Sequence, residues 1–317
     1  MLTYKDWLRY IGKRLLMMIP VLIGVSMIIF LIMEFTPGDP VLRILGVEAT
    51  PEDYAEMEAK LGLDKNFVER YFIYMRDLIF KFDMGISWRT GRPVIDEIAP
   101  RLPVSIRIAV LVVAVAVLWG IPAGIYSAVK QNSFGDNVLR VVATVMVAMP
   151  RFWLAMLLVL AFAMKMGILP AIDDGTWQSY ILPVVCSAFP MGCSFLRLTR
   201  SSMLECIRED YVRTAKAKGV PSRTVVYKHA LQNALLPVVT NVGASFGVIL
   251  GGSIISEQVF SLQGMGQLMV LSIRANDTPT ILSSVLMLAF FFSVVILVVD
   301  LLMAVIDPRV KAKIKKG

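Results

Sequence analysis

Long apolar runs separated by shorter polar stretches dominate this chain. Six of the runs reach the roughly 20 apolar residues that a helix needs to cross a membrane. They occupy Leu15–Phe35, Ile106–Tyr126, Val138–Met164, Tyr180–Leu198, Leu235–Ile255 and Ile281–Ile306. The pattern therefore predicts an all-α integral membrane protein with six transmembrane helices in one domain spanning residues 1–317.

The first apolar run has the basic flank of a secretory signal, because it follows Lys5, Arg9, Lys13 and Arg14. However, it is longer than the apolar core of about 7–15 residues that such a signal carries. It also lacks a small-x-small cleavage site before Glu34. We therefore expect a retained helix.

The basic residues near the helix ends predict the orientation. They gather in residues 1–14, 197–229 and 309–316, whereas the loops 165–180 and 256–280 each hold a single basic residue. Cytoplasmic loops carry the excess of lysine and arginine. Both termini and the loop at 199–230 are therefore expected in the cytoplasm.

Residues 36–103 form a long segment that this topology places outside the cytoplasm. Thr50-Pro51-Glu52-Asp53 is typical of a helix start, and Gly62 of its end. A second stretch, Phe67–Phe82, carries aromatic and aliphatic residues at helical spacing. This partly helical segment is expected to be a lid packed on the span ends or a platform for an external partner, and one segment can do both.

Composition supports a membrane protein: 57% of residues are hydrophobic and 18% are charged. Soluble domains average about 25% charged residues. The net charge of +8 is explained by cytoplasmic loops, so no nucleic-acid partner is expected. Cys186 and Cys193 lie in an apolar run and are expected to act as small hydrophobic residues, with no metal site.

The sequence lacks the phosphate-binding motif GxxxxGK[ST] and the metalloprotease motif HExxH, and it has one histidine. We expect no catalytic residues. If ATP drives this protein, another chain must hydrolyse it.

The cytoplasmic loop between the fourth and fifth runs has a distinctive pattern. Residues Met203–Lys218 have helical composition, Gly219 is a good stop, and Ser222 caps a second helix after Pro221. The small residues Ala215 and Ala217 lie near the turn, where they would let a partner approach closely. The alternative is an ordinary basic loop that obeys the charge rule for cytoplasmic segments.

Part of this loop resembles the "EAA" loop of ABC-importer permeases, in the version of the dipeptide/oligopeptide/nickel group. The similar residues are Asp210-Tyr211-Val212-Arg213-Thr214-Ala215-Lys216-Ala217-Lys218-Gly219. Further motifs of this family follow the same order along nearly the whole chain, and together they look most like the B-type permease of the pair. They are Phe35-Thr36-Pro37-Gly38-Asp39-Pro40, Leu61-Gly62-Leu63-Asp64-Lys65, Arg101-Leu102-Pro103, Glu257-Gln258-Val259-Phe260 with Gly264-Met265-Gly266, and Asp300 with Ile306-Asp307-Pro308-Arg309.

The chain departs from the family pattern at three places. Arg213 and Thr214 replace the glutamate and first alanine of the motif, and Gln232 stands where other permeases have proline. Arg151 follows Pro150 where a small polar residue such as serine is expected. The first two departures fit the peptide branch, and the third could reflect a particular substrate.

The resemblance implies a type I ABC-importer transmembrane domain in a bacterial or archaeal plasma membrane. It also implies a second permease, two ATP-binding subunits that hold ATP and Mg, and an extracytoplasmic binding protein; this chain would bind no cofactor. The coupling contacts to the ATPase would come from Asp210, Tyr211, Arg213, Thr214, Ala215, Ala217 and Gly219.

Two charged residues within apolar runs are candidates for the transport pathway. Arg151 lies about 13 residues into the third run, near mid-membrane at about 1.5 Å per residue. A charge there is costly and usually faces a cavity or a partner. Arg151 could bind a substrate carboxylate or pair structurally with Asp300 in the sixth run.

Gly243, Gly247 and Gly251 recur every four residues in the fifth run. Small residues at this spacing allow transmembrane helices to approach closely. The stripe either packs within this chain or lines the pathway or partner permease.

Three alternatives to peptide transport remain open from the sequence. Nickel and oligosaccharide importers of the same family share these motifs. A secondary transporter or channel would need no ATPase, but such carriers often contain inverted repeats, and none is evident between the two halves of the chain.

Overall fold

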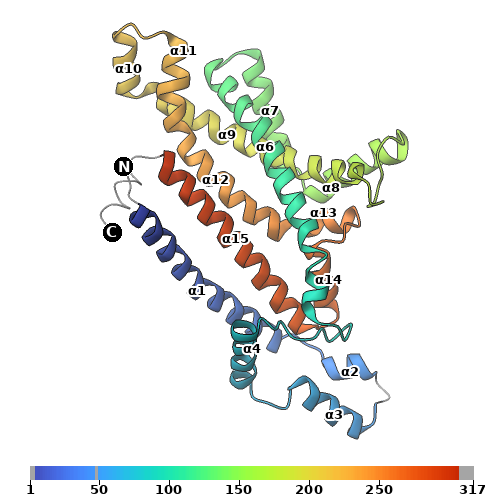
Figure 1. The fold of residues 1–317 in the computed structure, drawn as a ribbon. Helices are drawn as coiled ribbons and strands as arrows, with labels where there is room; N and C mark the ends of the chain where they lie inside the picture. Colours follow the sequence, from blue (N-terminus) through green and yellow to red (C-terminus); the bar gives the residue numbers. More distant parts are fainter. Residues whose placement is uncertain (1–3, 47–48, 307–317) are drawn as a thin grey trace. The chain divides into compact units, whose positions relative to one another are not determined.

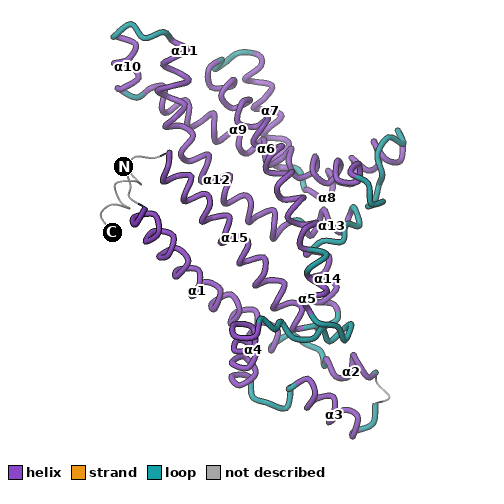
Figure 2. Tube along the Cα trace, in the orientation of Figure 1, coloured by secondary structure: helices purple, strands orange, loops and turns teal. Residues whose placement is uncertain are grey.

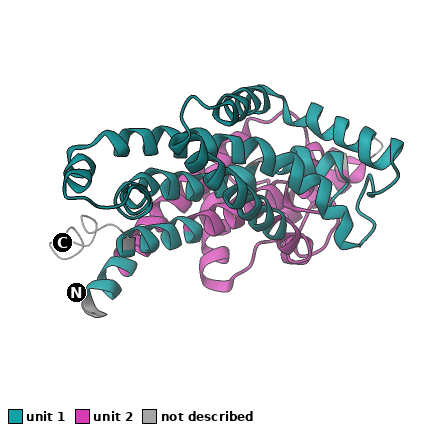
Figure 3. Cartoon of the chain, turned by 90° about the horizontal axis from the view of Figure 1, so that it is seen from above, with its two compact units in different colours: residues 1–11, 106–262, 294–317 teal, residues 12–105, 263–293 magenta. Residues whose placement is uncertain are grey.

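The computed structural model describes residues 4–46 and 49–306, and within them the regular structure is helical (Figures 1 and 2). Asp307, Pro308 and Arg309, which belong to the last of the sequence motifs, lie outside the described residues. The helices divide into two compact units (Figure 3). The first unit holds residues 1–11, 106–262 and 294–317, and the second holds residues 12–105 and 263–293.

The long helices follow the apolar runs. They are α1 (Tyr4–Glu34), α6 (Leu102–Val129), α9 (Ile181–Arg208), α12 (Leu231–Gly252) and α15 (Thr278–Ile306). Among the described residues, five helical stretches are long and apolar enough to cross a membrane, and a sixth is a bent pair. The expected all-α architecture is confirmed.

The third apolar run differs from the expectation of one continuous helix. It forms α7 (Phe134–Ala148) and α8 (Arg151–Leu158), bent by 104°, followed by a π-helical stretch at Val159–Lys165. Pro150 has no backbone N–H, and a proline disfavours helical geometry in the residue before it. Met149 is accordingly extended, with φ −75° and ψ 128°. Arg151 therefore begins a helix instead of lying in the middle of one.

Close backbone contact between α6 and α9 organises the first unit. A Cβ atom added at Gly120 would lie 2.4 Å from the carbonyl oxygen of Gly192, and one at Gly124 would lie 2.6 Å from Cβ of Thr199. Only glycine permits this approach, which maximises van der Waals contact where lipid supplies no hydrophobic driving force. The core between α9 and α7 includes the buried side chain of Cys193.

The second unit contains the segment between the first two long helices: α2 (Pro40–Leu45), α3 (Pro51–Leu61), α4 (Phe67–Lys81) and α5 (Val94–Ile98). The predicted start of α3 is confirmed, because Thr50 and Asp53 form a reciprocal capping box. Asp39 caps α2 by accepting hydrogen bonds from the amides of Val41 and Leu42. The Tyr54 hydroxyl donates to the other carboxylate oxygen of Asp39 at 2.7 Å, which links α3 to α2.

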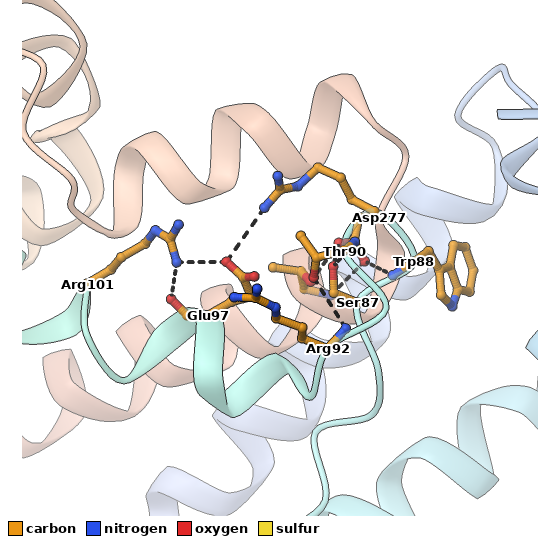
Figure 4. A network of polar contacts seen from close by, with 9 residues as sticks. Ser87, Trp88, Thr90, Arg92, Glu97, Arg101 and Asp277 are labelled. Atoms are coloured by element: carbon orange, nitrogen blue, oxygen red, sulfur yellow. Dashed lines mark hydrogen bonds and ion pairs between the residues drawn. The ribbon is translucent and has the colours of Figure 1, made fainter. Parts of the chain in front are cut away.

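A buried polar network fixes the loop before α5 to the start of α15 (Figure 4). The Asp277 carboxylate accepts hydrogen bonds from the Ser87 hydroxyl, the Trp88 amide at 3.0 Å and the Thr280 hydroxyl at 2.8 Å. Nearby, Glu97 accepts a 2.8 Å hydrogen bond from the guanidinium of Arg101. These contacts satisfy carboxylates that would be costly to bury alone.

Candidate functional site: the α10 turn and the broken third run

The loop that resembles the family motif forms α10 (Asp210–Ala217), a tight turn, and α11 (Ser222–Thr224), which continues through π-helical residues Val225–Ala230 into α12. The Gly219 amide donates to the Lys216 carbonyl and the Val220 amide donates to the Ala215 carbonyl. This is the Schellman arrangement, which requires a left-handed residue just after the helix. Gly219 supplies it with φ +76°, so its first role is to form the turn.

A small apolar core supports this turn from within the first unit. Val212, Val225 and Ala230 are buried together, and Ala215 and Val220 pack against them. Ala215 lies near the turn, as expected, but it is half-buried and faces the core. The exposed small residues of the turn are Ala217 and Gly219.

The polar residues of α10 face solvent. Arg213 and Asp210 are 77% and 97% exposed and lie 3.7 Å apart, so this pair contributes little stability. Tyr211 is tied to the start of α12, because the Asn233 side-chain amide donates to its hydroxyl at 3.1 Å. Partial burial raises the pKa of Tyr211. The helix thus offers an exposed face on a fixed base.

Arg151 occupies the first position of α8, directly after the break. Its backbone carbonyl oxygen lies 3.5 Å from Sγ of Cys186 on α9. The ion pairs formed among the described residues do not include its half-buried guanidinium. The structural pair with Asp300 is therefore not formed in this state, and Asp300 lies half-buried on α15.

The glycine stripe of α12 divides into different environments. Gly243 is buried, and a Cβ atom there would lie 2.5 Å from Cγ2 of Val299 on α15. Gly247 is half-buried, and Gly251 is exposed, with no atom within 4 Å of an added Cβ. Packing within the chain accounts for Gly243 and leaves Gly251 uncovered.

Sequence reasoning missed the ion pair that connects α7 to α9. Asp136 is fully buried in the first turn of α7, and both of its carboxylate oxygens accept hydrogen bonds from Arg200. Ser127 and the Asn132 amide donate to the same carboxylate. An aspartate three residues after a capping serine is typical of a helix start. Its position in the sequence therefore gave no reason to expect a tertiary partner 64 residues away.

The described residues thus form a multi-pass, all-helical membrane protein in which the exposed helix α10 lies between two long helices, α9 and α12. The family described as binding-protein-dependent transport system inner membrane component matches residues 120–312, and its N-terminal companion family matches residues 7–109. The chain belongs to this family of multi-pass proteins of the bacterial inner membrane.

Relatives of known function match almost the full length. A dipeptide transport system permease protein of Alkalihalophilus pseudofirmus is 41% identical over 96% of this chain and 99% of its own. The glutathione transport system permease protein of Escherichia coli is 39% identical over 96% of this chain and all of its own. The solved structure of an amino acid ABC transporter covers 67% of this chain and 92% of its own, at 16% identity and a TM-score of 0.49; it adds no support of its own.

Proposed function

We propose that this chain is one of two permease subunits in an ATP-binding-cassette importer for short peptides. The observation that carries the proposal is the full-length similarity to permeases named for dipeptide and for glutathione transport. Dipeptides and glutathione share a short peptide backbone with charged ends. These names favour a peptide cargo over the nickel and oligosaccharide alternatives.

In this proposal α10 transmits the state of a separate ATPase subunit to the membrane helices. The exposed face that includes Arg213, Thr214 and Ala217 would contact that subunit. The core of Val212, Val225 and Ala230 ties α10 to the start of α12, so a displacement of α10 would be passed to that long helix. ATP binding can drive transport only if it stabilises one arrangement of the pathway over the other.

In this proposal, other subunits provide ATP hydrolysis, the second half of the pathway and delivery of the peptide. Two ATP-binding subunits would hold ATP and Mg, a second permease would complete the type I pathway, and an extracytoplasmic binding protein would deliver the peptide. This chain would perform no bond chemistry and hold no cofactor. Both termini and α10 would face the cytoplasm, as the basic loops favour.

Arg151 is proposed to contribute to peptide selection in the pathway. A guanidinium stays protonated and binds a carboxylate with two parallel hydrogen bonds. Arg151 begins a helix after a break, where the helix dipole also favours an anion. A peptide with a free C-terminal carboxylate offers that anion.

Reconstitution of the complete complex tests the function. The chain is co-expressed with the second permease, the ATPase subunits and the binding protein of the proposed importer, and the complex is placed in proteoliposomes. We expect ATP-dependent uptake of a labelled dipeptide or glutathione that stops when the binding protein is omitted. Uptake that runs without ATP would identify a secondary transporter, and uptake only of nickel or an oligosaccharide would overturn the peptide assignment.

A further inference from the structure

The helix α4 is amphipathic, but protein covers only part of its apolar surface. At about 100° per residue, Phe67, Tyr71, Tyr74 and Leu78 share one side, and Val68, Phe72 and Ile79 lie directly beside them. Met75 lies between the two groups, so one apolar sector spans roughly 160° of the helix. The charged residues Glu69, Arg70, Arg76, Asp77 and Lys81 occupy the rest, together with Ile73 and Phe80.

The first part of this sector packs on α1 and the start of α15. The rings of Phe67 and Tyr71 contact Phe30 edge-on, with centroids 5.1 and 5.4 Å away. Leu282 of α15 completes this buried cluster. The hydroxyl of Tyr74 lies 3.1 Å from that of Ser283. This side of α4 is therefore fully explained by packing within the second unit.

The second part of the sector remains uncovered. Phe72 is 66% exposed, and Val68 and Ile79 are 57% and 54% exposed. Water contact with three large apolar side chains on one stripe would forfeit the favourable free energy of burying them. Something apolar must cover this stripe.

The contacts with α1 show at which level α4 lies. The Tyr71 hydroxyl is 2.8 Å from that of Ser26 and 3.3 Å from the carbonyl oxygen of Ile23. Ser26 precedes Glu34, the last residue of α1, by eight positions, which is about 12 Å along a helix. The hydrocarbon core is about 30 Å thick. Tyr71 thus reaches a level well inside the apolar run of α1, so α4 cannot lie far above the membrane.

Charges mark the polar side of the same helix. Arg70 forms an ion pair with Glu34 at the end of α1. Arg76 and Lys81 are 59% and 62% exposed on the charged sector. An interfacial helix places cationic side chains toward the headgroups and sinks its apolar face about 5–10 Å into the boundary with the acyl chains.

We propose that α4 lies in the membrane interface at the C-terminal end of α1, with Val68, Phe72 and Ile79 in contact with lipid. The argument for lipid is depth: the uncovered stripe lies on the same helix as Tyr71, whose hydroxyl reaches Ser26 and the carbonyl oxygen of Ile23 within the apolar run of α1. α1 also exposes Ile28, Leu31 and Ile32, which lie on the side of that helix away from α4. Lipid anchorage of α4 would hold the α2–α3 segment at a fixed height above the membrane, and it does not depend on which cargo is transported.

Collision accessibility of spin labels tests this proposal on the assembled complex in nanodiscs of phosphatidylethanolamine and phosphatidylglycerol. Single cysteines replace Phe72 or Ile79 in a cysteine-free background, and Glu69→Cys on the charged sector is the matched control. Oxygen concentrates in the acyl region, whereas a water-soluble nickel chelate does not enter it. Acyl-chain-labelled lipids calibrate the depth.

We expect labels at positions 72 and 79 to favour oxygen over the nickel chelate, and the label at position 69 to favour the chelate. Greater accessibility to the chelate at 72 and 79 would show a water-exposed helix and overturn the proposal. Low accessibility to both reagents would show a protein partner on this stripe, either the second permease or the binding protein, and would also overturn it. Repeating the measurement without binding protein distinguishes those two partners.

Discussion

Asp136 and Arg200 form a bidentate ion pair, with Nε 2.8 Å from Oδ1 and a terminal guanidinium nitrogen 3.0 Å from Oδ2. It joins the first turn of α7 to the C-terminal half of α9, although the two residues are 64 positions apart in the chain. Asp136 is fully buried, whereas the Arg200 side chain is 17% exposed. A pair of this kind specifies how two helices meet, and removing one partner leaves the other charge uncompensated.

Replacing Asp136 alone should therefore destabilise the protein. For Asp136→Ala we expect a loss of about 3 kcal/mol, at the low end of the range for breaking a buried pair because Arg200 retains some access to solvent. The double variant Asp136→Ala/Arg200→Leu should lose less than the sum of the two single variants. The stability losses of the single and double variants are measured by thermal unfolding in detergent, in which the fraction of protein that stays monodisperse is monitored. Additive losses would show that the two charges are not coupled.

The exposed face of α10 should be required for coupling but not for folding. Ala217 is exposed and makes no core contact, so Ala217→Glu should leave expression and membrane insertion unchanged. If the glutamate side chain costs about 1.4 kcal/mol at the contact with the ATPase subunit, the affinity of that contact falls about tenfold. Uptake should then decrease as well. The measurement is transport together with substrate-stimulated ATP hydrolysis in the purified complex.

The control for this prediction is Ala217→Ser, which keeps a small side chain and should retain uptake. Ala215→Glu is a poorer test, because Ala215 packs on the core beneath α10 and its replacement would disturb the fold. Normal uptake by Ala217→Glu at normal expression would contradict the assignment of α10 as the coupling helix.

Arg151 should matter for cargo with a free carboxylate. Arg151→Ser should leave the complex assembled, because the guanidinium makes no ion pair among the described residues, yet it should impair uptake of peptides with a free C-terminus. Peptides with an amidated C-terminus should lose less, since they present no carboxylate. Internalised peptide per peptide held by the binding protein is the quantity to compare. Equal losses for both peptides would exclude carboxylate recognition by Arg151.

The topology predicts which positions an impermeant reagent reaches. Lys65 and Thr176 are exposed residues of loops assigned to the outside, and Ser222 is an exposed residue assigned to the cytoplasm. In a cysteine-free background, Lys65→Cys and Thr176→Cys should react with a membrane-impermeant maleimide on intact cells, whereas Ser222→Cys should react only after lysis. Labelling of Ser222→Cys on intact cells would reverse the orientation. Asn66 is less suitable than Lys65, because it caps α4.

Acid should loosen the start of α2. Burial alone would raise the pKa of Asp39, but hydrogen bonds from the Tyr54 hydroxyl and the Leu42 and Val41 amides lower it below 3.8 overall. A lowered folded-state pKa means that the ionised carboxylate stabilises this arrangement above pH 3.8, and that the stabilisation is lost as pH falls through the folded-state value. Protection of the Val41 and Leu42 amides from hydrogen exchange should therefore decrease toward pH 3. Asp39→Asn should be less protected at neutral pH and less sensitive to acid, and an equal acid response in both proteins would contradict this role.

Much of this protein follows from its sequence alone. Apolar runs of about 20 residues must become helices in a membrane, because only helices satisfy every backbone group without water. Local signals also determine helix ends: Thr50 and Asp53 cap α3 through neighbouring atoms, and Gly219 ends α10 because it tolerates a left-handed backbone. These features depend on residues a few positions apart.

Only the tertiary structure decided the features that depend on distant partners. The run at 138–164 looked continuous because its composition does not show in which direction the chain leaves a proline. The structure has a 104° bend at the break next to Pro150, which has no backbone N–H to donate. Ala215 and Ala217 are chemically identical, but the core of Val212 and Val225 covers one and leaves the other exposed. Likewise, the ion pair of Asp136 with Arg200 and the packing of one side of α4 on α1 are contacts between residues far apart in the chain, and no local sequence pattern specifies them.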